Sequence, residues 1–321
     1  MQRRAVIRYA VGAILPGLAG INLTACQQGL EESTAMNINH PETSATADFP
    51  LSLAQWSLHR ALWAGDLDHL DFAATARRLD IGAVEYVNQF FADKAEDAAY
   101  LEQMNGRAVD HDIRQLLIMV DGEGNLAGDD TKERQLAISN HHKWVHAAAR
   151  LGCHSIRVNA AGKGDAEDVA KRAVDSLTQL ASYAAQENIN ILVENHGGHS
   201  SSGAWLAGVM AAVNLPNCGT LPDFGNFTMA MFPPRKYDRY LGVEELMPWA
   251  MGVSAKTYDF DSQGEETTID IARMLGIVKA SGFKGHIGIE YEGSRLSEEA
   301  GIRATRDLLL RNLTEVQKPA H

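Results

Sequence analysis

The chain has 321 residues, of which 45% are hydrophobic and 22% are charged, and its formal net charge is -12. This is the composition of a globular protein with one large core, which excludes a disordered or fibrous chain. The acidic balance and the lack of a basic stripe argue against nucleic acid as a partner.

Residues 1–26 are expected to form an export signal rather than part of the fold. Arg3 and Arg4 precede an apolar run that is too short to span a membrane and that ends in Leu-Thr-Ala-Cys, with Cys26 last. This ending resembles a bacterial lipobox, whose cysteine is lipidated, and the arginine pair resembles a twin-arginine signal. The alternative is a plain secretory signal. We expect a periplasmic or cell-envelope lipoprotein, exported by the Tat or Sec route and held to the membrane only by lipid on Cys26.

Residues 27–49 are rich in Glu, Ser, Thr, Ala and Asn, which predicts a flexible tether. Residues 50–321 are then the folded part. No change in composition within them indicates a second domain.

From residue 50 onward, short apolar runs alternate with longer amphipathic runs, strand then helix, eight times. The expected strands span residues 51–59, 82–88, 114–121, 155–160, 189–195, 219–223, 251–258 and 285–291. The clearest helical patterns span residues 66–79, 131–150, 165–187, 269–280 and 297–313.

Strands that alternate with helices predict a parallel sheet. Eight such units in one domain of this size are typical of a (β/α)₈ TIM barrel, which is the α/β fold that we expect. The rival is an open doubly wound sheet. It usually carries a Gly-rich phosphate turn after its first strand, and residues 56–65 contain none.

Acidic residues stand at the carboxyl ends of several expected strands. In a barrel, Glu194, Asp223 and Glu290 would converge in one mouth, where like charges repel each other. A divalent cation such as Mn²⁺, Mg²⁺ or Zn²⁺ would resolve the conflict. The alternative is that each carboxylate forms a salt bridge with Arg157, Lys256 or Arg235.

Four motifs carry a resemblance to a known family: Leu-Val-Glu-Asn-His at 192–196, Pro-Asp-Phe-Gly-Asn at 222–226, Ser-Ala-Lys at 254–256 and Gly-Ile-Glu-Tyr-Glu-Gly at 288–293. In this order and spacing they resemble the xylose-isomerase-like sugar isomerase/epimerase superfamily, over residues 50–313. The resemblance implies a (β/α)₈ barrel with a divalent metal. It also implies Glu194, Asp223 and Glu290 as the metal ligands.

Two positions depart from the family pattern. Ser254 stands where the family has a histidine ligand after strand seven, and Asn226 stands where a histidine usually follows the strand-six motif. The metal would then be held by three carboxylates and water, or His196 would supply a nitrogen ligand. A weakened site or a lost metal is the other reading.

The resemblance also suggests roles for the site residues. Glu194 and Glu290 would act as the acid/base pair, with Lys256 or His196 supporting the developing oxyanion, although Lys256 is equally well explained as a buried counter-ion. Arg235 lies in a segment, 231–239, that is either a lid or a solvated loop, and Trp56 either faces a sugar or packs. Six side chains are expected to contact substrate: Arg157, Asn159, Asn226, Trp56, Glu292 and Arg235.

Three functions follow. The first is a metal-dependent isomerase or epimerase of a small-molecule sugar, acting through an enediolate. The second is a lyase that cleaves 3-keto-glycosides by β-elimination, which shares the first step. The third is a carbohydrate-binding barrel without catalysis. The sequence leaves the oligomeric state open, with a homo-oligomer as one outcome.

Overall fold

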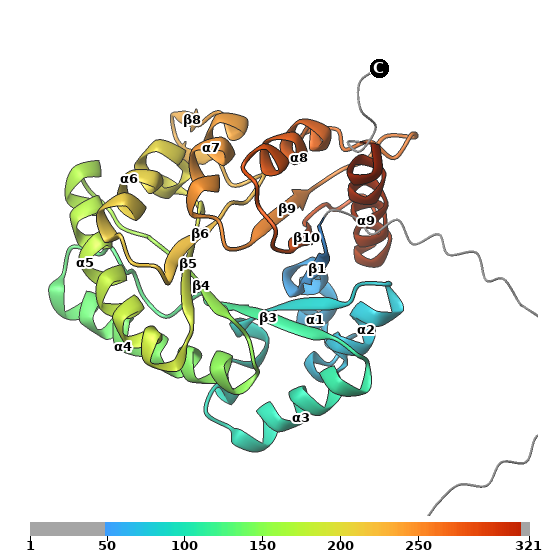
Figure 1. Cartoon of the computed structure of the whole chain (residues 1–321), viewed down its shortest axis with the longest axis horizontal. Coiled ribbons are helices and arrows are strands. Elements are labelled where there is room, and N and C mark those ends of the chain that lie inside the picture. Colours follow the sequence, from blue (N-terminus) through green and yellow to red (C-terminus); the bar gives the residue numbers. More distant parts are fainter. Residues whose placement is uncertain (1–48, 316–321) are drawn as a thin grey trace, which may run out of the picture. The chain divides into compact units, whose positions relative to one another are not determined.

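The computed structural model describes residues 49–315; the predictions for the export signal, Cys26 and residues 27–48 lie outside them. In the described part, eight parallel strands form one sheet in the order β6-β5-β4-β3-β2-β1-β10-β9, surrounded by helices (Figure 1). The strands are β1 Leu51–Ala54, β2 Ala83–Val87, β3 Arg114–Met119, β4 Ser155–Asn159, β5 Asn190–Glu194, β6 Cys218–Leu221, β9 Val253–Thr257 and β10 Ile287–Tyr291.

The two strands at the ends of this order, β6 and β9, are joined to each other. Backbone bridges connect Thr220 to Ala250 and Asp223 to Ser254, and the Ser254 N–H donates to the Pro222 carbonyl at 2.9 Å. We call this joint the seam. Because it closes the sheet on itself, the predicted (β/α)₈ barrel is confirmed.

The α-helices of the described part are α1 His59–Ala64, α2 Phe72–Arg78, α3 Ala98–Asp110, α4 Thr131–Arg150, α5 Ala166–Ala184, α6 Gly203–Val213, α7 Arg239–Leu246, α8 Ile271–Ala280 and α9 Glu298–Glu315. Aspartate side chains cap the first turns of α3, α4, α5, α7 and α8 by accepting backbone N–H groups. A hairpin of β7 Thr228–Met231 and β8 Pro234–Lys236 follows β6. No helix described is both long and apolar enough to cross a membrane.

Two cores hold the barrel together. The larger lies between the strands and the helices, and it takes the outward-facing side chains such as Ile289 and Tyr291 of β10. A smaller one fills the barrel interior with Ala54, Val87, Leu117, Met119, Leu192 and Leu221. Because side chains alternate along a strand, the residue two positions after an interior apolar residue also faces inward. Leu192 and Glu194 are such a pair, so the inner core forms a floor beneath polar groups.

The predicted first strand, 51–59, is wrong in its second half. The strand ends at Ala54, residues Gln55–Leu58 form a 3₁₀ turn, and α1 follows. The buried Gln55 side chain accepts the Val87 N–H at 2.9 Å, so a side chain replaces the backbone ladder where β1 would continue beside β2. Trp56 therefore lies in a helical turn above the barrel mouth rather than at a strand end.

We expect Gly301→Ala to lower the free energy of unfolding by about 1–3 kcal/mol, because a Cβ at this buried position of α9 would collide with the Tyr291 ring of β10. Gly276→Ala is the matched control, since a Cβ there in α8 meets nothing within 4 Å. The control should be neutral or gain about 0.5–1 kcal/mol. Urea denaturation of both variants checks this, and an equal effect of the two would contradict close packing of α9 on β10.

Candidate functional site

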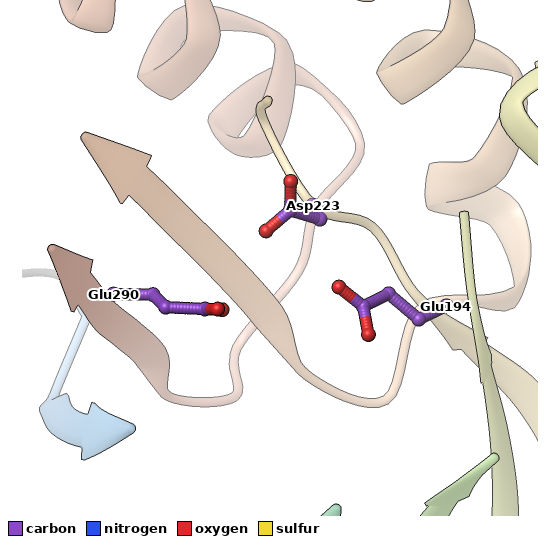
Figure 2. A group of neighbouring side chains, drawn as sticks. All are labelled: Glu194, Asp223 and Glu290. Atoms are coloured by element: carbon purple, nitrogen blue, oxygen red, sulfur yellow. The ribbon is translucent and has the colours of Figure 1, made fainter. Parts of the chain in front are cut away.

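Three carboxylates meet at the carboxyl ends of the barrel strands (Figure 2). Glu194 ends β5, Asp223 follows β6, and Glu290 lies in β10. All three side chains are buried, and one oxygen of each lies within 4.8 Å of the other two. Figure 2 shows the three carboxylates pointing toward a common centre from three different elements. The predicted convergence of these residues is therefore what the fold produces.

Backbone and amide groups fix Asp223 in place. Its Oδ1 accepts the N–H groups of Gly225 and Asn226, both at 2.8 Å. Asn195 holds the Asp223 backbone on both sides, accepting its N–H at 2.8 Å and donating to its carbonyl at 2.9 Å. The other oxygen, Oδ2, is thereby directed into the barrel mouth.

Two buried cations hold the carboxylates together. The Arg157 Nε lies 2.9 Å from Glu194 Oε2, and its Nη1 lies 2.7 Å from Asp121 Oδ1. The Lys256 Nζ lies 2.8 Å from Glu290 Oε1 and 3.0 Å from the Glu292 carboxylate. Burial alone would lower the pKa of Lys256, but the surrounding carboxylates raise it well above its usual value. Lys256 is therefore charged, and it serves as a counter-ion.

The carboxylates of the site do not share one protonation behaviour. Burial raises the pKa of Asp223 to about 7. The positive charge of Lys256 lowers this pKa, whereas the negative charges of Glu290 and Glu194 raise it further. Burial would also raise the pKa of Glu290, but Lys256 and Ser254 hold it below its usual value. Glu290 is thus ionised at neutral pH, whereas Asp223 titrates there.

Ser254 lies between two of the carboxylates. Its Oγ is 2.7 Å from Asp223 Oδ2 and 2.6 Å from Glu290 Oε2. A hydroxyl has one proton to donate, so it can serve only one of two ionised oxygens. The second contact needs a proton on a carboxyl group, which agrees with the raised pKa of Asp223. In the absence of a cation, a proton on Asp223 thus compensates the negative charge between the two carboxyl groups.

The donor set fits a divalent metal. The buried Glu194 Oε2 accepts no hydrogen bond, because the nearby Arg157 Nε is not aligned with it. Glu194 Oε1 accepts from Asn226 Nδ2 at 2.9 Å, which fixes the carboxylate while leaving Oε2 available. Carboxylate oxygens, such as this one, are the ligands that hard cations prefer. Within residues 49–315, Glu194, Asp223 and Glu290 are the group that could hold such an ion, and His196 is not part of it.

A cavity of about 240 Å³ opens beside the three carboxylates. Small-molecule sites are usually about 300–1,000 Å³, so this one suits a single small ring. It is lined by Trp56, Gln89, Asp121, Arg157, Glu194, His196, Asn226, Lys256, Glu290 and Glu292. Nearly all of these side chains can form hydrogen bonds, as recognition of a hydroxyl-rich ligand requires.

Two residues that we expected at the substrate lie elsewhere. Asn159 does not line the cavity but supports it, donating from Nδ2 to Asp121 Oδ1 at 2.6 Å. Arg235 lies in the exposed β8 of the hairpin and is not among the lining residues. Arg235 was expected at the substrate because it lies in a basic, proline-rich segment. In the fold, this segment belongs to the antiparallel β7–β8 hairpin.

Asp121 is a site residue that the sequence analysis missed. It lies two residues after the end of β3, so the rule that polar groups after barrel strands form the site would have found it. Burial would raise its pKa, but Arg157, His196 and Asn159 together lower it to about 2. Asp121 is therefore an anion that holds Arg157 at the cavity wall.

Glu85 of β2 is a second missed residue, buried inside the barrel near the carboxylate group. Ser52 Oγ donates to its Oε1 at 2.6 Å, and its Oε2 has no hydrogen-bond partner. Burial raises the pKa of Glu85 to about 7, opposed by the Ser52 hydrogen bond. It fits there because Gly288 of the neighbouring β10 has no Cβ, which would lie 2.7 Å from Glu85 Oε1.

We expect the metal-free protein to lose stability as the pH rises from about 4.5, the usual pKa of a glutamate, to about 7, the pKa of Glu85 in the fold. In that window the folded state keeps the proton and the unfolded state releases it. Glu85→Gln removes this effect. The difference in free energy of unfolding between the variant and the parent should therefore be about 1–3 kcal/mol more favourable to the variant at pH 8 than at pH 5. Urea denaturation at both pH values measures this, with the exposed Glu102→Gln as control. The same difference at both pH values would contradict a raised pKa.

Comparisons with known proteins agree with this architecture. A sequence model described as the xylose isomerase-like TIM barrel matches residues 73–312. The C-glycoside deglycosidase alpha subunit of Arthrobacter globiformis is 26% identical over 131 residues, which cover 41% of this chain and 32% of that protein. The chain thus spans about a third of the length of this curated relative.

Solved structures share the fold at low sequence identity. The IolI protein with a bound zinc atom has a TM-score of 0.66 and 16% identity, over 83% of this chain and 98% of that one. The 3-keto-D-glucoside 4-epimerase of E. coli, in its apo form, has a TM-score of 0.60 and 14% identity, over 75% and 94% of the two chains. These likenesses concern the fold, and they include a metal-bound member.

Proposed function

The chain belongs to the xylose isomerase-like TIM barrel family, and we propose that it is a metal-dependent isomerase or epimerase of a keto-sugar. The observation that carries the proposal is the pair of glutamates, Glu194 and Glu290, which reach the same cavity from β5 and β10. Two carboxylates on different walls allow one to remove a proton beside a carbonyl and the other to return a proton at another position or face.

Glu194, Asp223 and Glu290 would hold the divalent metal, which is Mn²⁺, Mg²⁺ or Zn²⁺ by its oxygen ligands. When bound, such a cation supplies Lewis acidity that stabilises negative charge on a substrate oxygen. Arg157 and Lys256 keep the neighbouring carboxylates ionised and oriented. Glu290, whose pKa Lys256 and Ser254 hold below its usual value, is ionised at neutral pH and so can accept a proton.

The remaining cavity residues position the sugar. Asn226 and Glu292 offer a donor and an acceptor to hydroxyl groups, and His196 lies at the rim, where it can donate to an oxygen that gains charge. Lys256 is 2.8 Å from Glu290, so its main task in this proposal is to set the charge of that base. We also propose that the protein is an exported lipoprotein modified at Cys26, as its first residues suggest.

A lyase that cleaves 3-keto-glycosides by β-elimination is the second candidate. It is favoured by the similarity of part of the chain to the C-glycoside deglycosidase alpha subunit of Arthrobacter globiformis. It needs the same first proton transfer, and a leaving group then departs instead of a proton being returned. The two candidates therefore differ in the fate of the deprotonated sugar and share the residues that generate it.

Metal binding can be tested without a substrate. We expect Asp223→Asn to lower the affinity for Mn²⁺ by at least about tenfold, as measured by titration calorimetry at pH 7.5, because it removes one of three anionic ligands. Affinity in the parent protein should rise as the pH increases through about 7, since the cation must displace the Asp223 proton. The exposed Asp110→Asn serves as control. Equal affinity of Asp223→Asn and the parent would remove Asp223 from the ligand set.

The reaction is tested by proton NMR in D₂O, with Mg²⁺ or Zn²⁺ and a panel of ketoses and 3-keto-glycosides. Deuterium beside the carbonyl with the carbon skeleton retained supports the isomerase or epimerase, whereas release of the aglycone with an enone supports the lyase. Glu194→Gln and Glu290→Gln should each slow exchange by about 10²–10⁴-fold, because each removes an acid/base group. Glu102→Gln is the control. Near-normal exchange in both site variants would contradict the assignment of the pair.

A further inference from the structure

We infer that the cavity continues outward into an aromatic subsite, made by Trp56, His59, Trp63 and Phe90, which binds a planar aromatic group attached to the substrate's sugar. We call these four residues the aromatic platform. The inference rests on the proposed function, because it places the sugar in the cavity. It deepens that function by assigning the substrate class: glycosides with a flat aromatic aglycone rather than free sugars.

The four rings of the aromatic platform are in contact with one another. The Trp56 and His59 rings are stacked, with centroids 4.9 Å apart and an interplanar angle of 16°. Trp63 meets Trp56 edge-on, at 5.1 Å and 90°. Phe90 lies 5.9 Å from Trp63 and 6.3 Å from Trp56. The platform is thus one continuous aromatic surface, built after β1 and β2, at the same end of the barrel as the carboxylates.

The platform is joined to the cavity through Trp56. Trp56 lines the cavity, and its Nε1 donates to Glu292 Oε1 at 3.1 Å. Glu292 in turn lies 3.0 Å from Lys256 Nζ, which contacts Glu290. These contacts fix the indole relative to the reacting groups, so a ring on the platform and a sugar in the cavity can belong to one molecule.

Core packing accounts for part of the platform only. Trp56 and Phe90 pack against the inner core of the barrel, but Trp63 is in neither core. Its side chain is 58% exposed, and its ring contacts are with Trp56, His59 and Phe90 of the platform. An exposed tryptophan in contact with three partly buried rings, one of which lines a cavity, fits a binding surface. Core packing therefore does not explain why residue 63 is a tryptophan, whereas contact with a ligand would.

The division between polar and aromatic walls identifies the ligand. Apart from Trp56 and His196, the cavity side chains are charged groups or amides, which match the hydroxyls of a sugar. With about 240 Å³, the cavity suits a single ring. The outer part, Trp63 and Phe90, offers ring faces and few hydrogen-bonding groups. A flat aromatic ring can stack on these faces, and it needs no hydrogen bonds from the outer wall.

The test measures binding rather than turnover, by titration calorimetry with three probes that share one sugar: 4-nitrophenyl β-D-glucopyranoside, methyl β-D-glucopyranoside and cellobiose. We expect the nitrophenyl glucoside to bind at least fivefold more tightly than either of the others. Trp63→Ala should remove most of this advantage, and Trp63→Phe should keep most of it. Binding of the methyl glucoside should be equal in all three proteins, because Trp63 does not line the cavity.

The exposed Leu136→Ala on α4 is the control for loss of a large apolar side chain, and it should leave the nitrophenyl advantage unchanged. Thermal unfolding checks that Trp63→Ala is folded, which the exposure of Trp63 leads us to expect. Failure of the nitrophenyl glucoside to bind, equal affinity for the nitrophenyl and methyl glucosides, tighter binding of cellobiose, or an unchanged advantage in Trp63→Ala would each overturn the inference.

The outcomes also separate this inference from the proposed function. A nitrophenyl advantage that depends on Trp63, in a protein that catalyses no deuterium exchange with any keto-sugar, would support the subsite and contradict the isomerase or epimerase. Exchange that depends on Glu194 and Glu290, with no preference for the nitrophenyl glucoside, would support the reaction and overturn the subsite.

Discussion

The site depends on the compensation of buried negative charge. Six carboxylates lie in or next to one cavity: Glu85, Asp121, Glu194, Asp223, Glu290 and Glu292. The buried cations Arg157 and Lys256 contact all of them except Glu85. Removing charges from water is costly, and repulsion among like charges adds to the cost. The fold tolerates this because protons on Glu85 and Asp223, together with the two cations, reduce the net charge. Such an arrangement is characteristic of a functional site rather than of a stabilising one.

The barrel creates this concentration of charge by geometry alone. Parallel strands end at the same edge, and alternation directs every second side chain inward, so one polar residue per strand suffices to build a charged mouth. The inner apolar core, with Leu192 and Leu221, separates this mouth from the rest of the barrel. The chemistry therefore requires no special local conformation of Glu194 or Glu290, which lie in regular strands.

The sequence predicted the eight barrel strands and the three carboxylates, because apolar runs and polar strand ends are local patterns. It failed where tertiary contacts decide. The end of β1 depends on Gln55 capturing a backbone group of β2, and α6 is apolar on nearly every face, which hides the helical period. Glu85 was passed over because its importance lies in a neighbour, Gly288, that is distant in sequence. Arg235 was overvalued because its basic, proline-rich surroundings indicate a loop but not the direction in which the loop folds.

The seam between β6 and β9 has a mechanical consequence. Asp223 and Ser254 are bridge partners across it, and the Ser254 hydroxyl reaches toward Glu290 on the far side. A cation bound by Glu194, Asp223 and Glu290 would link the two sides of the seam, because Glu194 and Asp223 come from the β5–β6 side and Glu290 comes from the β9–β10 side. Binding of the metal would then also stabilise the barrel against opening at the seam. The junction that is closed by isolated bridges is thus also the place where the metal would bind.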